Sequence, residues 1–229
     1  MSRRDKIDST KQKRLERERL LRREALIDVA EEFFIREGYE RTMVDKIALE
    51  AGYTKATIYN YFDSKDDLYM AVASRAFEHM HRIMKETLSH PETAYELRSL
   101  GDAYLAFVDQ YPEHAEMMDS GQLSIAFNGI VRKEKAKQSL TESETELRQH
   151  QLTIERLMTD VVTQTMENSG VQRKADPFAV VYALSTLGLA IRELVMRGKT
   201  GDLPEEQTRE YLSVLFNIID QGLKHYDAE

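Results

Sequence analysis

The sequence predicts an all-α protein, because its composition, its apolar spacing and its few helix breakers all favour helices. The 229 residues include only ten glycines and four prolines, and Leu, Glu, Arg, Lys, Ala and Met are abundant. Apolar residues recur at helical spacing, and the sequence has no strand-like alternation to compete with it. A chain of this length accommodates one small domain and a larger helical body.

The N-terminal segment is basic and leads into the first predicted helix. Residues 1–23 carry ten basic and four acidic residues, a net charge of +6, and the remaining 22 basic and 36 acidic residues give −14. We interpret residues 1–21 as a basic arm or helix extension that attracts a polyanion, with a solvated helix face or a disordered tail as alternatives. A helix is then predicted from about Arg22 to Glu37, stopped by Gly38.

Two further short helices are predicted directly after it. The second helix, MVDKIALEA, is capped by Thr42, with Asp45 completing a capping box, and ends at Gly52. The third, KATIYNYF, is capped by Thr54. A small apolar core is predicted from Phe34, Val44, Ile47, Ala48, Ala51, Ile58 and Phe62. Three short helices within fifty residues indicate a helix-turn-helix unit.

Longer helices are predicted beyond this unit. The fourth, capped by Ser64 with Asp67, runs from Lys65 to about Ser89. Others are predicted near residues 92–110, 113–133, 138–168, 176–197 and 205–225. The charged segment 132–149 is interpreted as a solvated helix face in preference to a loop. These elements divide the chain into a basic segment (1–21), a helix-turn-helix domain (22–68) and a larger helical domain (69–229).

The residues of the helix-turn-helix unit also fit a family pattern at fixed spacing. They are Ala30, Phe34, Gly38-Tyr39, Thr42, Ile47-Ala48, Ala51-Gly52, Ile58-Tyr59, Tyr61-Phe62, Lys65 and Leu68. On these residues the segment resembles the DNA-binding domain of the TetR/AcrR family of transcription regulators. The resemblance implies a homodimeric regulator, expected to be a repressor that a small apolar or aromatic effector releases from a palindromic double-stranded DNA operator.

The third predicted helix presents polar side chains that suit a DNA groove. Lys55 and Asn60 can hydrogen-bond to base edges, whereas the phenols of Tyr59 and Tyr61 can donate to phosphate oxygens. The ammonium of Lys65, beside the first N–H groups of the fourth helix, forms an anion site. The resemblance implies the same roles and adds further positions. The predicted DNA-binding residues are Thr42, Lys55, Ala56, Thr57, Tyr59, Asn60, Tyr61 and Lys65.

Two positions depart from the family pattern. Met43 stands where the family often has a small hydroxyl residue, so Thr42 is expected to take over a contact from that position. Ala56 stands where glycine is common, which stiffens the start of the helix and leaves less room for the DNA backbone.

The larger domain is expected to form the dimer, because one helix-turn-helix unit covers a single half-site. The last two predicted helices carry apolar stripes, the first with a small-residue flank (Ala179, Ala183, Thr186, Ala190), and are expected to pair with their symmetry mates in a four-helix bundle. The predicted dimerisation residues are Val180, Leu184, Leu187, Ile191, Leu215 and Ile219.

A region rich in Met and aromatic residues predicts an effector pocket, with ordinary core packing as the alternative for each residue. A bound effector is expected to tilt the fourth helix and change the spacing of the two DNA-reading units. The predicted lining is Met80, Met84, Tyr104, Phe107, Met117, Met118, Phe127 and Tyr182.

Other functional classes receive little support from the sequence. It contains no phosphate-binding loop, nucleophile elbow or HExxH motif, so no enzyme, cofactor or metal site is predicted. His79 and His81 diverge on a helix, and His114 is interpreted as part of a solvated helix end. Without cysteine, a signal peptide or an 18-residue apolar run, a cytoplasmic protein free of the membrane is expected. A constitutive or architectural DNA-binding protein is the alternative. Activation in place of repression also stays open, because the sign of regulation depends on where the operator lies.

Overall fold

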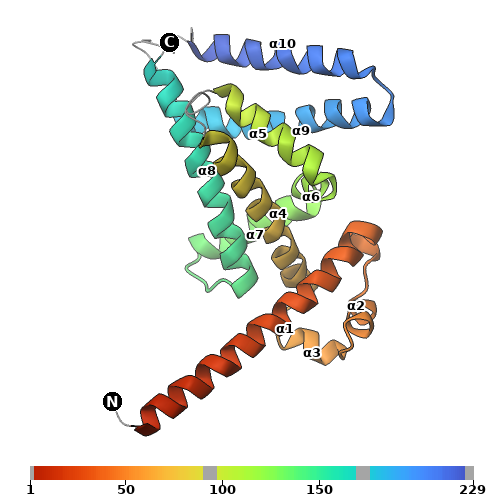
Figure 1. The fold of residues 1–229 in the computed structure, drawn as a ribbon, viewed down its shortest axis with the longest axis vertical. Coiled ribbons are helices and arrows are strands. Elements are labelled where there is room, and N and C mark those ends of the chain that lie inside the picture. Colours follow the sequence, from red (N-terminus) through yellow and green to blue (C-terminus); the bar gives the residue numbers. More distant parts are fainter. Residues whose placement is uncertain (1–2, 90–96, 169–175, 225–229) are drawn as a thin grey trace. The chain divides into compact units, whose positions relative to one another are not determined.

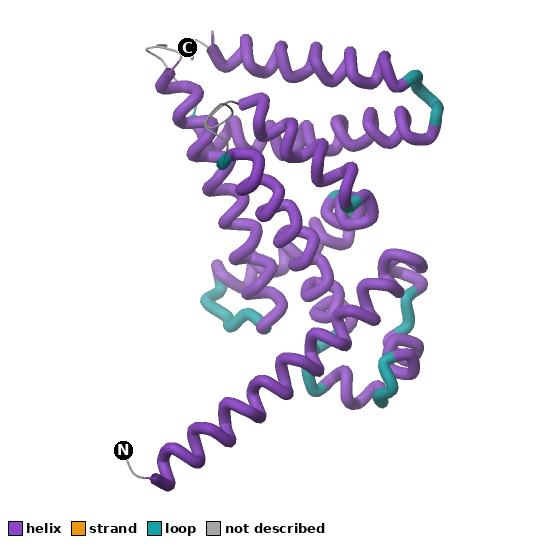
Figure 2. The backbone as a smooth tube through the Cα atoms, viewed as in Figure 1, coloured by secondary structure: helices purple, strands orange, loops and turns teal. Residues whose placement is uncertain are grey.

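The computed structural model describes residues 3–89, 97–168 and 176–224, and every regular element within these ranges is an α-helix (Figures 1 and 2). The predicted all-α class is therefore confirmed. Two compact units divide the chain: unit 1 comprises residues 1–74 and 124–146, and unit 2 comprises residues 75–123 and 147–229.

Unit 1 is built on a three-helix core. It contains α1 (Arg3–Arg41), α2 (Val44–Glu50), α3 (Lys55–Tyr59) and the start of α4 (Lys65–Leu88). Its largest fully buried side chains are Leu26, Ile47, Ile58, Phe62, Leu68 and, from the returning segment 124–146, Ile130. All seven predicted core residues except Ala51, which is half-buried, are buried.

The first helix differs from its prediction at both ends. It is helical from Arg3, so the basic segment continues α1, and Gly38 interrupts it with a positive φ of 75° but an extended ψ of 165°. Thr42 does not cap α2: Met43 holds that position without a side-chain bond. The Thr42 hydroxyl instead donates to the carbonyl oxygens of Gly38, at 2.7 Å, and Phe33, at 3.2 Å, so the predicted capping box is wrong.

Unit 1 also includes most of α7 (Gly121–Lys135) and the first turn of α8 (Glu142–Asn168). The predicted boundary at residue 68 misses this return of the chain. Residues 136–141 form a loop, so the segment 132–149 is not one helix. A capping box ends the loop: Glu144 N donates to Thr141 Oγ1 at 3.1 Å, and Thr141 N donates to Glu144 Oε2 at 2.9 Å.

Unit 2 contains the rest of α4 and α8 with α5 (Leu97–Gln110), α6 (Pro112–Met118), α9 (Pro177–Thr200) and α10 (Glu205–Lys224). α9 packs against α5 and α10. The single helix predicted at 113–133 is two helices, because Ser120 begins a new one by accepting a bond from Leu123 N at 3.2 Å. The start of the helix predicted at 92–110 and the end of that predicted at 205–225 lie partly outside the described residues.

Candidate nucleic-acid interface and cavity

A tight turn presents α3 to solvent. Gly52, with φ of 72°, follows α2 in the left-handed conformation, and Tyr53 N donates to Ala48 O at 2.8 Å. The next residue, Thr54, caps α3 by accepting a bond from Thr57 N at 3.2 Å, as predicted. Because Ile58 is buried and anchors the helix, the opposite face points outward.

This outward face carries the predicted base-reading residues. Lys55, Ala56, Tyr59 and Asn60 are exposed, and Thr57 is half-buried with its hydroxyl 2.9 Å from that of Thr54. Lys55 Nζ is 2.8 Å from Asp45 Oδ2 on α2, and the neighbouring carboxylate raises the pKa of the lysine. Since an exposed ion pair contributes little stability, Lys55 can exchange this partner for DNA.

The predicted phosphate contacts fall into two groups. Tyr61 and Lys65 are half-buried, with Lys65 Nζ 4.3 Å from the centre of the Tyr39 ring and 3.4 Å from Glu40 O. Thr42, in contrast, is only 2% exposed and its hydroxyl is already engaged. Its predicted DNA contact is therefore incompatible with this conformation. Sequence reasoning missed exposed Tyr53, which directly precedes the cap of α3.

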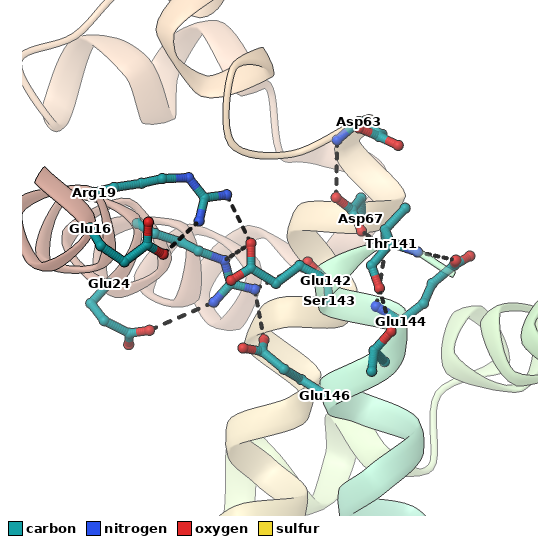
Figure 3. Close-up of polar contacts among 12 residues, drawn as sticks. Glu16, Arg19, Glu24, Asp63, Asp67, Thr141, Glu142, Ser143, Glu144 and Glu146 are labelled. Carbon is teal, nitrogen blue, oxygen red and sulfur yellow. Dashed lines mark hydrogen bonds and ion pairs between the residues drawn. The ribbon is translucent and has the colours of Figure 1, made fainter. Parts of the chain in front are cut away.

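A polar cluster joins α1 to the first turn of α8 (Figure 3). It also lies beside the end of α3. Arg19 donates to Glu142 at 2.9 Å, and Arg23, which is 2% exposed, donates to Glu146 at 2.7 Å. The guanidinium carbons of Arg19 and Arg23 lie 5.9 Å and 5.4 Å from the ring centres of Tyr61 and Phe62. Their spacing of four residues, which places both on one helix face, was the sequence signal for this cluster.

The N-terminus of α4 is tied to the same region. Ser64 and Asp67 form the predicted cap: Asp67 N donates to Ser64 Oγ and Asp63 N donates to Asp67 Oδ2, both at 3.0 Å. The other carboxylate oxygen of Asp67 accepts a bond from the Thr141 hydroxyl. Helices α4 and α8 thus begin side by side within unit 1 (Figure 3).

Unit 2 encloses a cavity of about 350 Å³ with a largely apolar lining. Aliphatic and methionine side chains from α4, α5, α8, α9 and α10 supply most of the wall. Five of the predicted residues line it, namely Met80, Met84, Tyr104, Met118 and Tyr182. Phe107 and Met117 are buried but do not line it, and Phe127 belongs to unit 1, so these three predictions are wrong.

A half-buried polar group stands in the wall of this cavity. Arg192 Nε donates to Asp119 Oδ2 at 2.6 Å, and the Tyr104 hydroxyl also hydrogen-bonds to Asp119. Burial raises the pKa of Asp119 although Arg192 opposes the shift, and burial together with Asp119 raises the pKa of Tyr104. The cavity therefore combines a long apolar wall with one position that can hydrogen-bond to a ligand.

The predicted dimerisation residues lie largely inside the chain. Leu184, Leu187, Ile191 and Ile219 line the cavity, and Val180 and Leu215 are half-buried. The small flank Ala179, Ala183, Thr186 and Ala190 is exposed. Large exposed apolar residues on α9 and α10 are Phe178, Tyr182, Tyr211, Val214 and Ile218. This exposed surface is the part of the two helices left for a partner.

Helix α9 also has the length and composition of a membrane span, with a mean hydropathy of 1.6 over its most apolar 18 residues and only 12% of that window buried. The expectation that no such run exists is therefore wrong. A helix that packs in a protein core or against a partner passes the same test. His114 also differs from its prediction, because it is buried and its ring contacts those of Tyr111 and His79.

Comparison with known proteins agrees with the fold and the DNA-reading unit. Residues 26–72 match the family described as "Bacterial regulatory proteins, tetR family". The HTH-type transcriptional activator FasR of Mycolicibacterium smegmatis is 32% identical over 89 residues, 38% of this chain and 41% of that protein. The fatty acid metabolism regulator protein of Bacillus subtilis is 33% identical over 95 residues, 37% of this chain and 49% of that protein. The chain thus matches less than half of either relative's length.

Solved structures resemble the chain over most of its length. The fatty acid degradation regulator FadR of Bacillus halodurans has a TM-score of 0.56 at 18% identity and covers 90% of this chain and 99% of its own. A Rhodococcus protein of unknown function has a TM-score of 0.63 at 16% identity and covers 89% and 96%. These likenesses concern the fold. The match to the tetR family of bacterial regulatory proteins is confined to residues 26–72, and the rest of the chain resembles these structures in fold alone.

Proposed function

We propose that the chain is a homodimeric, sequence-specific DNA-binding transcription regulator that acts in the cytoplasm as a repressor. The observation that carries this proposal is the outward face of α3, where a capped short helix exposes Lys55, Tyr59 and Asn60 on a buried anchor, Ile58. A short polar helix of this kind fits the major groove. The exposed apolar surface of α9 and α10 supports a dimer that places two such helices on a palindrome.

The cavity of unit 2 supports control by a small molecule. Its wall of aliphatic and methionine side chains suits an extended apolar ligand, and Tyr104 with Asp119 can hydrogen-bond to a polar group. Two of the similar proteins are named for fatty acid metabolism or degradation. We therefore propose an effector with a long aliphatic chain. A constitutive or architectural DNA-binding protein is the second candidate, but a cavity of this size lowers stability unless a ligand fills it.

Selection of binding sequences from random duplexes, at near-physiological salt, tests the proposal. A regulator recovers one near-palindrome and prefers it about a thousandfold or more over unrelated DNA. Retention that depends on salt but not on sequence would favour the architectural alternative. Fatty acids and their thioesters of increasing chain length are then titrated into the protein–DNA complex, and release of the duplex identifies the effector class.

A further inference from the structure

We propose that the N-terminal part of α1 is a rigid arm that binds the phosphates of duplex DNA flanking each half-site. The inference rests on the proposed DNA-binding function, but it concerns residues upstream of the matched segment 26–72. Figure 1 shows this part of α1 continuing past α3. It is helical from Arg3, although nothing in the three-helix core requires a helix of this length.

The arm carries cations that have no acidic partner. Lys11, Lys13, Arg17 and Arg22 are exposed and form no ion pair within the described part of the chain. The neighbouring Arg14 differs, because it pairs with a glutamate one turn away. Exposed cations without an acidic partner are available to bind an anionic ligand such as a phosphate backbone.

The four cations lie on two sides of the helix. At about 100° per residue, Lys11 and Arg22 are about 20° apart around the axis and Lys13 and Arg17 about 40° apart, with the two pairs on roughly opposite sides. A helix lying in a DNA groove has a phosphate backbone along each side. The arrangement therefore fits contacts to both backbones at once.

Two arginines hold the base of the arm in place. Arg19 and Arg23 bind the first turn of α8 through Glu142 and Glu146 and lie beside Tyr61 and Phe62, at the end of α3. The arm is thus joined to the same elements that present the DNA-reading residues. From Arg3 to Arg22 it spans about 29 Å, or about nine base pairs of duplex.

The exposed leucines of the arm argue against an anionic membrane as its partner. Leu15, Leu20 and Leu21 are exposed, but at helical spacing they point to three different sides. A helix that binds a membrane surface needs one continuous apolar face. The arm offers charge without such a face, which favours DNA.

The test measures how the charge of the arm and the length of the DNA flanks together affect binding. The selected palindrome is made with duplex flanks of about ten base pairs, beyond the reach of the arm, and also with blunt ends at the half-sites. The variant K11Q/K13Q/R17Q/R22Q removes the four unpaired cations and keeps good helix formers. Its matched control, K135Q/K137Q/R156Q/R197Q, makes the same change of net charge at exposed cations elsewhere.

We expect the arm variant to bind the flanked duplex at least about tenfold more weakly than the wild type and the control. With four cations removed from each of the two arms of the dimer, the slope of log K against log salt should become shallower by up to about 7. The variant's preference for the palindrome should persist, and blunt ends should weaken binding by the wild type and the control but not by the arm variant. The arm proposal is overturned if the wild type prefers the palindrome but neither the arm substitutions nor removal of the flanks weakens binding. If the wild type shows no preference for any sequence, the proposed function itself is overturned. Binding of the arm to phosphatidylserine vesicles, with no effect on DNA, would also overturn the arm proposal.

Discussion

Replacing Arg23 by methionine is expected to lower the free energy of unfolding by about 3 kcal/mol. The 2% exposed guanidinium donates to Glu146 at 2.7 Å, and a hydrogen bond to a charged group contributes about 2 kcal/mol. Its position 5.4 Å from the Phe62 ring centre adds about 1 kcal/mol. Methionine keeps the length and apolar stem of the side chain, so the loss reports the charge and its contacts.

Urea unfolding followed by circular dichroism at 222 nm measures this loss. Arg22→Met is the matched control, because Arg22 is exposed and unpaired, and it should change stability by less than about 0.5 kcal/mol. A double-mutant cycle of Arg23→Met with Glu146→Gln should give a coupling of about 1–2 kcal/mol. Equal stability of the two methionine variants, or a coupling near zero, would refute the role assigned to the Arg23 contacts.

Three further predictions concern unit 2. Leu187→Trp fills part of the cavity, so it should abolish the effector-induced release of DNA. Operator affinity, measured by fluorescence anisotropy, should change less than about threefold. Loss of DNA binding with an intact effector response would contradict this prediction. Tyr182→Glu with Ile218→Glu charges the exposed surface of α9 and α10, and light scattering should show a monomer; an unchanged dimer mass would exclude this surface. Burial and Asp119 raise the pKa of Tyr104, so the stability contributed by its protonated phenol is complete below about pH 10 and is lost at higher pH. Between about pH 10 and 11.5 the free energy of unfolding should therefore fall less in Tyr104→Phe than in the wild type. If the free energy of unfolding depends on pH in the same way in both proteins, the raised pKa of Tyr104 is refuted.

Local signals in the sequence were sufficient for the DNA-reading unit. The caps Thr54 and Ser64 and the turn at Gly52 act on their near neighbours, so spacing alone located α3 and α4. The cap of α2 was misplaced by one residue, because Thr42 satisfies the carbonyl of Gly38 behind it and leaves Met43 at the cap position.

Long-range packing could not be predicted in the same way. Helix α9 is apolar on several sides, so periodicity did not show whether Leu187 and Ile191 face the cavity or a partner. The return of residues 124–146 to unit 1 depends on contacts such as Arg23 with Glu146, which are 123 positions apart. Aromatic and methionine content predicted a cavity, but Phe127 lies in the other unit because sequence distance does not determine the unit to which a helix belongs.

The route from effector to DNA is expected to use α8 as well as α4. Both helices begin in unit 1 and continue into unit 2, where Met84 of α4 and Ile154 of α8 line the cavity. In unit 1 the first turn of α8 binds Arg19 and Arg23 through Glu142 and Glu146, beside the end of α3. If this link transmits the effector signal, Glu142→Gln with Glu146→Gln should keep the preference for the palindrome yet reduce the effector-induced change in affinity, typically 5–150-fold, by at least half on a logarithmic scale. An undiminished response would assign transmission to α4 alone.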